Sequence, residues 1–207
     1  MEAEGSAVDM SGAIAIFGAS SGSMDEAYYA AAYEMGALIA KSGKAMLFGG
    51  GDTGVMGAAA RGAHDAGGKV IGVIPEALNL PKIAYPECDE LIVTRDLRDR
   101  MAEMAERSDA FCVLPGGFGT LYELFEVITL NQLRYMLKPV ILLNTKGYYD
   151  RLGDLFEVMY EEKCAREMCR KLYAMAETPA EAMEQIARWT KPELTRWLTD
   201  VPEGELK

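Results

Sequence analysis

Short apolar runs alternate with longer amphipathic segments along most of the chain. The apolar runs are bounded by Gly, Pro or Asn and predict buried strands at 13–17, 45–48, 70–74, 110–114 and 140–143. The amphipathic segments have helical periodicity and predict helices at 25–40, 55–65, 96–107, 149–162 and 179–189. Weaker patterns predict short strands at 91–94 and 172–175. On the helix at 96–107 we expect Leu97, Met101, Met104 and Ala105 on the buried side, with Arg98 and Arg100 on opposite flanks.

Strands that alternate with helices predict an α/β fold, a Rossmann-like doubly wound parallel sheet in a single domain. We expect this domain to span 13–190, after an N-terminal tail at 1–12 and before a polar surface appendage at 191–207. Residues 75–89 contain three prolines and predict an irregular surface loop. In such sheets ligands bind at the carboxyl ends of the strands, where the strand order reverses.

Three glycine-bearing turns, at 18–23, 49–54 and 115–120, each follow a predicted strand. We expect them to gather at one edge of the sheet and to offer backbone N–H groups to an anion. None has the Gly-Lys-Ser/Thr ending of a Walker A loop, and the first is not a G-x-G-x-x-G dinucleotide turn. A single phosphate group is therefore the simplest ligand for these turns.

The stretch at 112–127, CVLPGGFGTLYELFEV, joins a strand end, a glycine turn and a helix. The helix is expected to have a core-facing stripe of Leu121, Leu124, Phe125 and Ile128. Thr120 and Glu123 lie beside that stripe, near the turn. Their spacing is that of a capping box, in which the two side chains satisfy each other's backbone donors, and it also suits a site where phosphate and a carboxylate meet. Taken alone, the pair supports both interpretations equally.

Composition narrows the range of partners. The formal net charge of −11 argues against nucleic acid or an anionic membrane surface as a general partner, since those contacts need clustered Lys and Arg. The four cysteines have neither CxxC nor His-paired spacing, so we expect cytosolic thiols rather than zinc ligands or disulfides. No apolar run approaches the ~20 residues of a membrane helix, and residues 1–12 lack the features of a signal peptide. We therefore expect a cytoplasmic protein.

Two motifs carry a resemblance to a known family. PGGFGTLYE at 115–123 matches the PGGxGTxxE motif of the LOG family, and GGGDTGVMG at 49–57 resembles that family's GGGxxGLMG. The resemblance extends over about 14–186. Family members include cytokinin riboside 5′-monophosphate phosphoribohydrolases and AMP nucleosidases, and they are often mislabelled as lysine decarboxylases. Lysine decarboxylation would need a pyridoxal lysine with partners for its phosphate and ring, and the sequence presents no such constellation.

The resemblance implies hydrolysis of the N-glycosidic bond of a nucleoside 5′-monophosphate, giving free base and ribose 5-phosphate. It implies Arg100 and Glu123 as the catalytic pair and demands neither a metal nor an organic cofactor. The residues that it suggests for phosphate and substrate binding are Gly116, Gly117, Phe118, Gly119, Thr120, Met101, Arg98, Gly50, Gly51 and Gly54. Family members usually form dimers, so we expect a homodimer with Arg134 or Tyr135 near the partner chain.

The sequence departs from the family pattern at three places. Met101 stands where the family has a lysine, Lys82 stands where many relatives have glutamate, and the QLGxHxKP segment is altered at 132–139. Arg98 or Lys82 can replace the missing charge. The base therefore stays open between a cytokinin, adenine and another base, and a non-catalytic nucleotide-binding or regulatory protein is the alternative function. We expect a structural or solvated role for His64 and a surface or dimer-contact role for Glu126.

Overall fold

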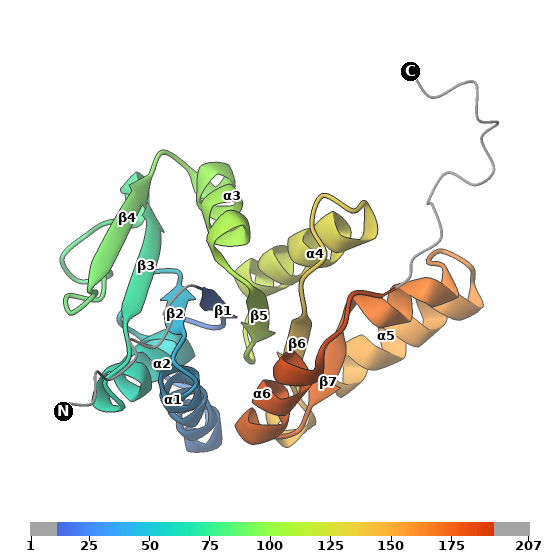
Figure 1. The fold of residues 1–207 in the computed structure, drawn as a ribbon, viewed down its shortest axis with the longest axis horizontal. Helices are drawn as coiled ribbons and strands as arrows, with labels where there is room; N and C mark the ends of the chain where they lie inside the picture. Colours follow the sequence, from blue (N-terminus) through green and yellow to red (C-terminus); the bar gives the residue numbers. More distant parts are fainter. Residues whose placement is uncertain (1–11, 193–207) are drawn as a thin grey trace, which may run out of the picture.

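Seven strands form one sheet in the order β4-β3-β2-β1-β5-β6-β7 in the computed structural model, which describes residues 12–192 (Figure 1). Every pairing between neighbouring strands is parallel, which confirms the predicted fold class. The strands are β1 (Ala13–Phe17), β2 (Ala45–Phe48), β3 (Val70–Pro75), β4 (Glu90–Thr94), β5 (Ala110–Val113), β6 (Val140–Leu143) and β7 (Ala174–Ala176). The expected N-terminal tail, apart from residue 12, and positions 193–207 of the expected appendage lie outside the described residues.

Helices cover both faces of the sheet. Helices α1 (Glu26–Lys41), α2 (Gly54–Asp65) and α6 (Pro179–Arg188) pack on one face, and α3 (Leu97–Arg107) and α4 (Phe118–Gln132) pack on the other (Figure 1). Helix α5 (Asp150–Glu161) contributes Phe156 and Tyr160 to a smaller apolar cluster beside β7. Three short 3₁₀ turns are η1 (Glu76–Leu78), η2 (Thr145–Gly147) and η3 (Glu167–Leu172).

Local sequence signals account for several helix ends. The Asp25 carboxylate caps α1 by accepting from the Ala27 N–H at 2.9 Å, and Asp96 caps α3 by accepting from the Arg98 and Asp99 N–H groups. Thr178 caps α6 in the same way, by accepting from the Glu181 N–H. These caps explain why the helix starts were predictable to within a residue.

Helices α1 and α2 approach each other closely because glycines lie at their contact. A Cβ atom on Gly36 would be 1.9 Å from the Ala59 carbonyl oxygen, and one on Gly62 would be 2.0 Å from the Tyr33 oxygen. Only glycine fits at these two positions, so the small residues of the two helices set their spacing.

The strand order reverses between β1 and β5. The chain builds β1 to β4 outward in one direction, then returns to the other side of β1 to begin β5, β6 and β7. The carboxyl ends of β1 and β5 therefore flank the crevice where sheets of this type bind ligands.

Two predicted helix faces were wrong in part, although Met101 and Met104 on α3 and Leu124 on α4 are buried as predicted. On α4 the buried residues are Thr120, Glu123, Leu124, Val127 and Asn131, whereas Phe125 is exposed and Leu121 and Ile128 are only partly covered. The helix is rotated so that Glu123 faces α3, and its ion pair with α3 replaces apolar contact there. On α3 the Leu97 side chain is 52% exposed instead of buried. Strand β7 also begins two residues later than predicted, because η3 extends to Leu172.

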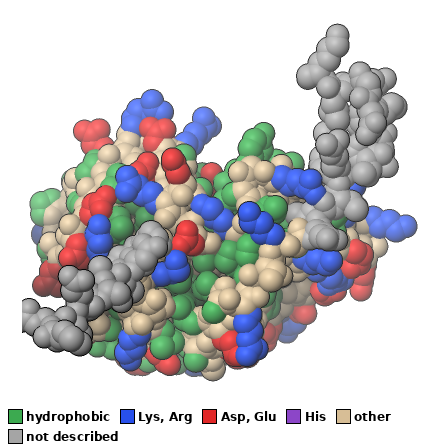
Figure 2. Space-filling view, in the orientation of Figure 1, with side chains coloured by type: hydrophobic (Ala, Val, Ile, Leu, Met, Phe, Trp, Pro, Cys, Tyr) green, Lys and Arg blue, Asp and Glu red, His purple; other side chains and the backbone are tan. Residues whose placement is uncertain are grey.

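The surface is mixed in character. On the face seen in Figure 2, acidic and basic side chains are interspersed and separated by hydrophobic and uncharged surface. Among residues 12–192, no helix combines the length and the apolar character needed to cross a membrane.

Candidate active site

The three glycine turns contact one another directly at the carboxyl ends of the strands. The Ala19 N–H donates to the Pro115 carbonyl at 3.2 Å, which joins the first turn to the third. The Val55 N–H donates to the Ala19 carbonyl at 3.0 Å, and the Thr53 hydroxyl donates to the Ser20 carbonyl at 2.8 Å, which joins the second turn to the first. The prediction that the turns gather at one edge is confirmed.

Two glycines permit this close packing. Gly54 has a φ of +69°, and a Cβ atom there would be 2.2 Å from the Ala19 carbonyl oxygen. A Cβ atom on Gly116 would be 2.1 Å from the Thr120 hydroxyl oxygen. Larger residues would push the first two turns apart or displace Thr120.

A cavity of about 640 Å³ opens between the turns. Its wall is built from the three turns, from the loop at 76–89 and from the facing sides of α3 and α4. The lining residues are Gly18, Ala19, Ser20, Ser21, Gly49, Gly51, Thr53, Met56, Ile74, Leu78, Lys82, Ile83, Leu97, Arg100, Gly117, Gly119, Thr120, Tyr122 and Glu123.

A buried ion pair lies on this wall. Arg100 on α3 and Glu123 on α4 approach to 2.7 Å, with side chains only 8% and 9% exposed. The Arg100 Nε–H also donates to the Val73 carbonyl at 3.1 Å, which fixes the guanidinium against β3. A Cβ atom on Gly49 would lie 2.5 Å from the Arg100 Nη2, so the glycine of the second turn makes room for the arginine.

Burial and the ion pair act in opposite directions on the Glu123 carboxyl. Burial raises the pKa of Glu123, whereas the Arg100 charge and hydrogen bond lower it, and burial has the larger effect. The nearby Glu126 carboxylate raises the pKa of Glu123 further. The group is thus a carboxylate that takes up a proton more readily than an exposed glutamate, beside a fixed cation.

The capping-box interpretation of Thr120 and Glu123 is wrong. Helix α4 begins at Phe118 with Gly117 as its N-cap, so Thr120 already lies within the first turn. The Leu121 N–H donates to the Gly117 carbonyl at 3.0 Å, and the N–H groups of Phe118, Gly119 and Thr120 precede that bond and have no acceptor within the helix. Such groups at a helix N-terminus stabilise an anion.

Sequence comparisons find a matching family model and several similar proteins. A family model described as "possible lysine decarboxylase" matches residues 56–186. A probable cytokinin riboside 5′-monophosphate phosphoribohydrolase of Oryza sativa subsp. japonica is 38% identical over 87% of this chain and 81% of its own length. A cytokinin riboside 5′-monophosphate phosphoribohydrolase of Arabidopsis thaliana is 37% identical over 85% of this chain and 82% of its own. The chain belongs to the LOG family.

Solved structures share the fold. The molybdenum cofactor binding protein of Rippkaea orientalis has a TM-score of 0.66 and 26% identity, covering 85% of this chain and 95% of that one. The molybdenum cofactor carrier protein of Chlamydomonas reinhardtii has a TM-score of 0.65 and 26% identity, covering 86% of this chain and 96% of that one. The sheet of the LOG-family chain is therefore an arrangement also found in proteins named for a different ligand.

Several residues expected at the site from the LOG-family motifs lie elsewhere. Met101 is fully buried in the core cluster formed with Met104, Phe111 and Leu124 and is not among the residues that line the cavity. The Phe118 side chain is 93% exposed, and Arg98 lines a neighbouring hollow with Leu78 and Leu97. Among the described residues, Gly50, Gly54 and Gly116 are also outside the cavity wall, where they shape the turns.

The sequence did not point to the apolar part of the wall. Met56, Ile74, Leu78, Ile83 and Leu97 line it, although Leu78, Ile83 and Leu97 are among the exposed large hydrophobic residues. Exposed leucines in a proline-containing loop and on a helix flank have no signal that separates a ligand wall from ordinary surface. Ser20, Ser21 and Thr53 were more accessible to prediction, because they lie in the glycine turns.

The loop at 76–89 is tied to the second glycine turn and to α2. The Asp52 N–H donates to the Ile83 carbonyl at 2.9 Å, and the Tyr85 N–H donates to the Gly50 carbonyl at 2.8 Å. His64 holds the same loop, with its two ring nitrogens 2.9 Å from the Tyr85 hydroxyl and 3.1 Å from the Asp89 carboxylate. The structural role expected for His64 is confirmed.

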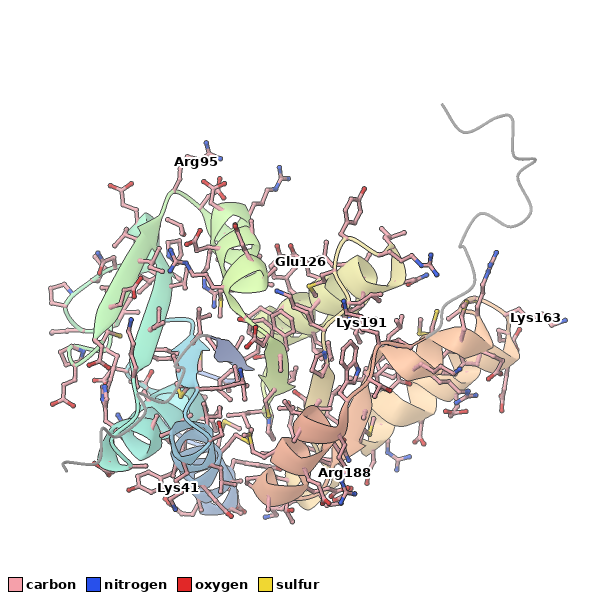
Figure 3. The ribbon with its side chains drawn as sticks, in the orientation of Figure 1. Lys41, Arg95, Glu126, Lys163, Arg188 and Lys191 are labelled. Atoms are coloured by element: carbon pink, nitrogen blue, oxygen red, sulfur yellow. The ribbon has the colours of Figure 1, made fainter. Side chains whose placement is uncertain are left out.

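Glu126 lies one turn beyond Glu123, on the side of α4 toward α3 (Figure 3). It is partly covered, and among the described residues its Oε2 atom has no hydrogen-bond partner. A hydrogen bond to Glu126 raises the pKa of Tyr122, which lines the cavity. Glu126 thus contacts a residue of the cavity wall and is not itself among the lining residues.

Proposed function

We propose that the cavity hydrolyses the N-glycosidic bond of a nucleoside 5′-monophosphate, giving a free base and ribose 5-phosphate. The observation that carries the proposal is the buried Arg100–Glu123 pair beside the free N–H groups of α4. Relatives that match most of this chain are named phosphoribohydrolases, which fits a site that combines an anion cradle with a carboxylate.

Glu123 supplies the carboxylate on which the proposed reaction depends. Cleavage of an N-glycosidic bond builds positive charge on the ribose as the base departs. A carboxylate stabilises that charge and takes a proton from the attacking water, and both effects depend on its ionised form. Arg100 favours the ionised form of the carboxylate and fixes it in a poorly solvated place, against the effect of burial.

The phosphate of the substrate lies at the start of α4. The N–H groups of Gly117, Gly119 and Thr120 and the Thr120 hydroxyl offer donors to it, next to the positive end of the helix. Holding the phosphate there fixes the ribose against Glu123, and such positioning lowers the barrier by several kcal/mol. Lys82 on the cavity rim supplies positive charge to a chain with a net charge of −11.

The base contacts the apolar part of the wall. Leu78, Ile83 and Leu97 offer flat apolar contact to a purine, which suits a cytokinin riboside 5′-monophosphate, AMP or both. Lys82 donates hydrogen bonds and accepts none, so it favours a base with an acceptor at its outer edge.

A chromatographic assay on a panel of nucleoside 5′-monophosphates tests the proposal. Wild-type protein should release the free base from at least one member of the panel, and Glu123→Gln should slow this release about 10²–10³-fold. Glu103→Gln is the matched control, because Glu103 lies on the outer side of α3 in an ion pair with Arg107 and should leave the rate unchanged. Activity retained in Glu123→Gln would contradict the assignment.

The second candidate is a non-catalytic nucleotide-binding or regulatory protein. The observations that favour it are the buried Met101 in place of the family's lysine and the 26% identity to two proteins named for binding or carrying a cofactor. The same panel separates the two functions. Tight binding of a monophosphate without base release from any nucleotide would support the binding protein.

We also propose a cytoplasmic homodimer. Large apolar side chains are exposed along α4 and at its end, among them Tyr122, Phe125, Leu133 and Tyr135. Arg134 and Tyr135 follow directly after this helix, where a second copy would cover them. Sedimentation of the full chain at micromolar concentration should give twice the mass of one chain, and a monomer alone would contradict the dimer.

A further inference from the structure

Three successive carbonyl groups before α4 each accept a hydrogen bond from another part of the chain. The Tyr149 hydroxyl donates to the Leu114 carbonyl at 2.7 Å, and the Tyr148 hydroxyl donates to the Gly116 carbonyl at 2.7 Å. Between them, the Pro115 carbonyl accepts from the Ala19 N–H. The carbonyl oxygens of Leu114, Pro115 and Gly116 thus all accept hydrogen bonds from within the protein.

We propose that Tyr148 is a positioning residue for the substrate phosphate, acting through the backbone of the glycine turn, and that Tyr149 supports it by anchoring the Leu114 carbonyl just after β5. A trans peptide is planar, so its C=O and N–H point in opposite directions. The hydrogen bond from Tyr148 to the Gly116 carbonyl therefore also fixes the direction of the Gly117 N–H. The inference rests on the proposed function, in which this turn holds the 5′-phosphate.

The turn needs such an anchor because of its glycines. Glycine populates many backbone conformations, so the peptide between Gly116 and Gly117 can rotate at little cost and turn its carbonyl oxygen toward the anion. An oxygen in that position would repel a phosphate, whereas an N–H binds it. The hydroxyl of Tyr148 selects the binding orientation.

Both tyrosines are suited to this part. Tyr149 is 1% exposed, and burial raises its pKa well above the usual range, so its hydroxyl stays protonated and remains a donor. The Tyr148 ring packs edge-on against Tyr149 at 5.0 Å and against Tyr28 of α1 at 5.9 Å. Tyr149 is therefore enclosed, and Tyr148, although 41% exposed, is held on two sides by other rings.

A tightly bonded segment presents the tyrosines. The Asn144 side chain accepts from the Tyr149 N–H at 2.7 Å and donates to Asp150 at 2.8 Å and to Glu177 at 3.0 Å. Lys146, at a φ of +59°, forms an ion pair with Asp25, the N-cap of α1. The segment after β6 is thereby fastened to β7 and α1 and holds both hydroxyls in place.

Tyr148→Phe tests the inference, with Tyr28→Phe as the matched control. Tyr28→Phe keeps a ring beside Tyr148, and the Tyr28 hydroxyl makes none of the hydrogen bonds to the turn. Tyr148→Phe should raise the KM for the nucleoside 5′-monophosphate and the Kd for ribose 5-phosphate about five- to tenfold, the worth of one net hydrogen bond. Its kcat should change less than threefold and its Tm should fall only slightly, because Tyr148 is partly exposed and water can replace its hydroxyl at the Gly116 carbonyl, while Tyr28→Phe should change none of these values.

Unchanged KM and Kd in Tyr148→Phe would overturn the inference, and so would a fall in kcat and Tm without a selective loss of phosphate affinity. Tyr149→Phe should also weaken ribose 5-phosphate binding, with an added loss of stability because the Leu114 carbonyl loses its donor. A folded Tyr149→Phe protein with wild-type Kd would remove Tyr149 from the proposal.

The Kd measurement separates this inference from the proposed function. Wild-type protein that releases no base but binds ribose 5-phosphate, with weaker binding in Tyr148→Phe, would refute the hydrolase and support the positioning role. Wild-type protein that does not bind ribose 5-phosphate would refute the positioning role itself.

Discussion

Removing Arg100 should destabilise the protein in a way that depends on pH. Arg100→Met keeps a long apolar side chain on α3 but leaves the Glu123 carboxylate buried without its cation, since the two groups are 2.7 Å apart and less than 10% exposed. A buried carboxylate without a partner takes up a proton rather than staying charged. The cost of the substitution is therefore the cost of keeping Glu123 neutral.

That cost can be worked out from ordinary titration. Each pH unit corresponds to about 1.4 kcal/mol, and the ordinary pKa of the group is 4.5. Keeping the carboxyl neutral at pH 7 thus costs about 3 kcal/mol of the free energy of unfolding, and at pH 5 it costs about 0.7 kcal/mol. The Val73 carbonyl also loses its donor from Arg100, which adds about 1 kcal/mol at both pH values.

Urea unfolding at pH 5 and pH 7 measures both parts. Arg100→Met should lose up to about 4 kcal/mol at pH 7 and up to about 2 kcal/mol at pH 5 relative to wild type, because the raised pKa of Glu123 means that wild type already bears part of the cost. The double variant Arg100→Met, Glu123→Gln has no buried acid, so it should lose a similar amount at both pH values. The stability of Arg100→Met falls as the pH rises because Glu123 has a raised pKa in the folded variant. The folded protein then binds more protons than the unfolded protein, and raising the pH favours the unfolded protein.

A loss in Arg100→Met that is equal at pH 5 and pH 7 would refute this reasoning. So would a double variant that keeps the pH dependence of the single variant. Either result would mean that Glu123 does not depend on Arg100 for its charge, and the ion pair would then have no part in keeping the carboxylate ionised.

Three further predictions concern other features of the molecule. Met101→Lys should destabilise the chain by about 2–5 kcal/mol in urea unfolding, because Met101 is fully buried beside Phe111, whereas Met101→Leu should cost less than about 1.5 kcal/mol; a stable and more active lysine variant would contradict the placement of Met101. Gly36→Ala should cost at least about 1–3 kcal/mol, because its Cβ would lie 1.9 Å from a carbonyl oxygen of α2, and the same change at Gly153, where the nearest atom is 3.2 Å away, should cost less; equal costs would count against the tight contact. The acid limb of kcat/KM should have its midpoint above 4.5, because burial raises the pKa of Glu123 and the ionised form is needed; a midpoint at or below 4.5 would show that another group controls activity.

Much of the fold was predictable because its signals are local. Strands such as β1 and β5 are buried on both faces and therefore appear as continuous apolar runs, and glycines mark the turns that follow β1, β2 and β5. The gathering of the three turns followed from topology alone, since parallel strands end at the same edge. Arg100 and Glu123 were identified through family motifs, and the structure brings them together as an ion pair.

The errors come from contacts between distant segments. The rotation of α4 could not be predicted because the face with Thr120 and Glu123 is polar, and its burial depends on Arg100 more than twenty residues upstream. Periodicity placed Leu97 in the core because an apolar residue at helical spacing gives the same pattern whether it packs in the core or lines a cavity. The hydroxyl groups of Tyr148 and Tyr149 are a similar case, since no local pattern shows that they reach the turn before α4.

Product stoichiometry shows in a single experiment whether Glu123 acts in hydrolysis of the bond between base and ribose. Incubation of wild-type protein with its best monophosphate, followed by quantification of all products, should give free base and ribose 5-phosphate in equal amounts without inorganic phosphate. Glu123→Gln, folded as judged by its unfolding curve, should form both products about 10²–10³-fold more slowly. Release of inorganic phosphate with an intact nucleoside, or equal rates in wild type and Glu123→Gln, would contradict the account.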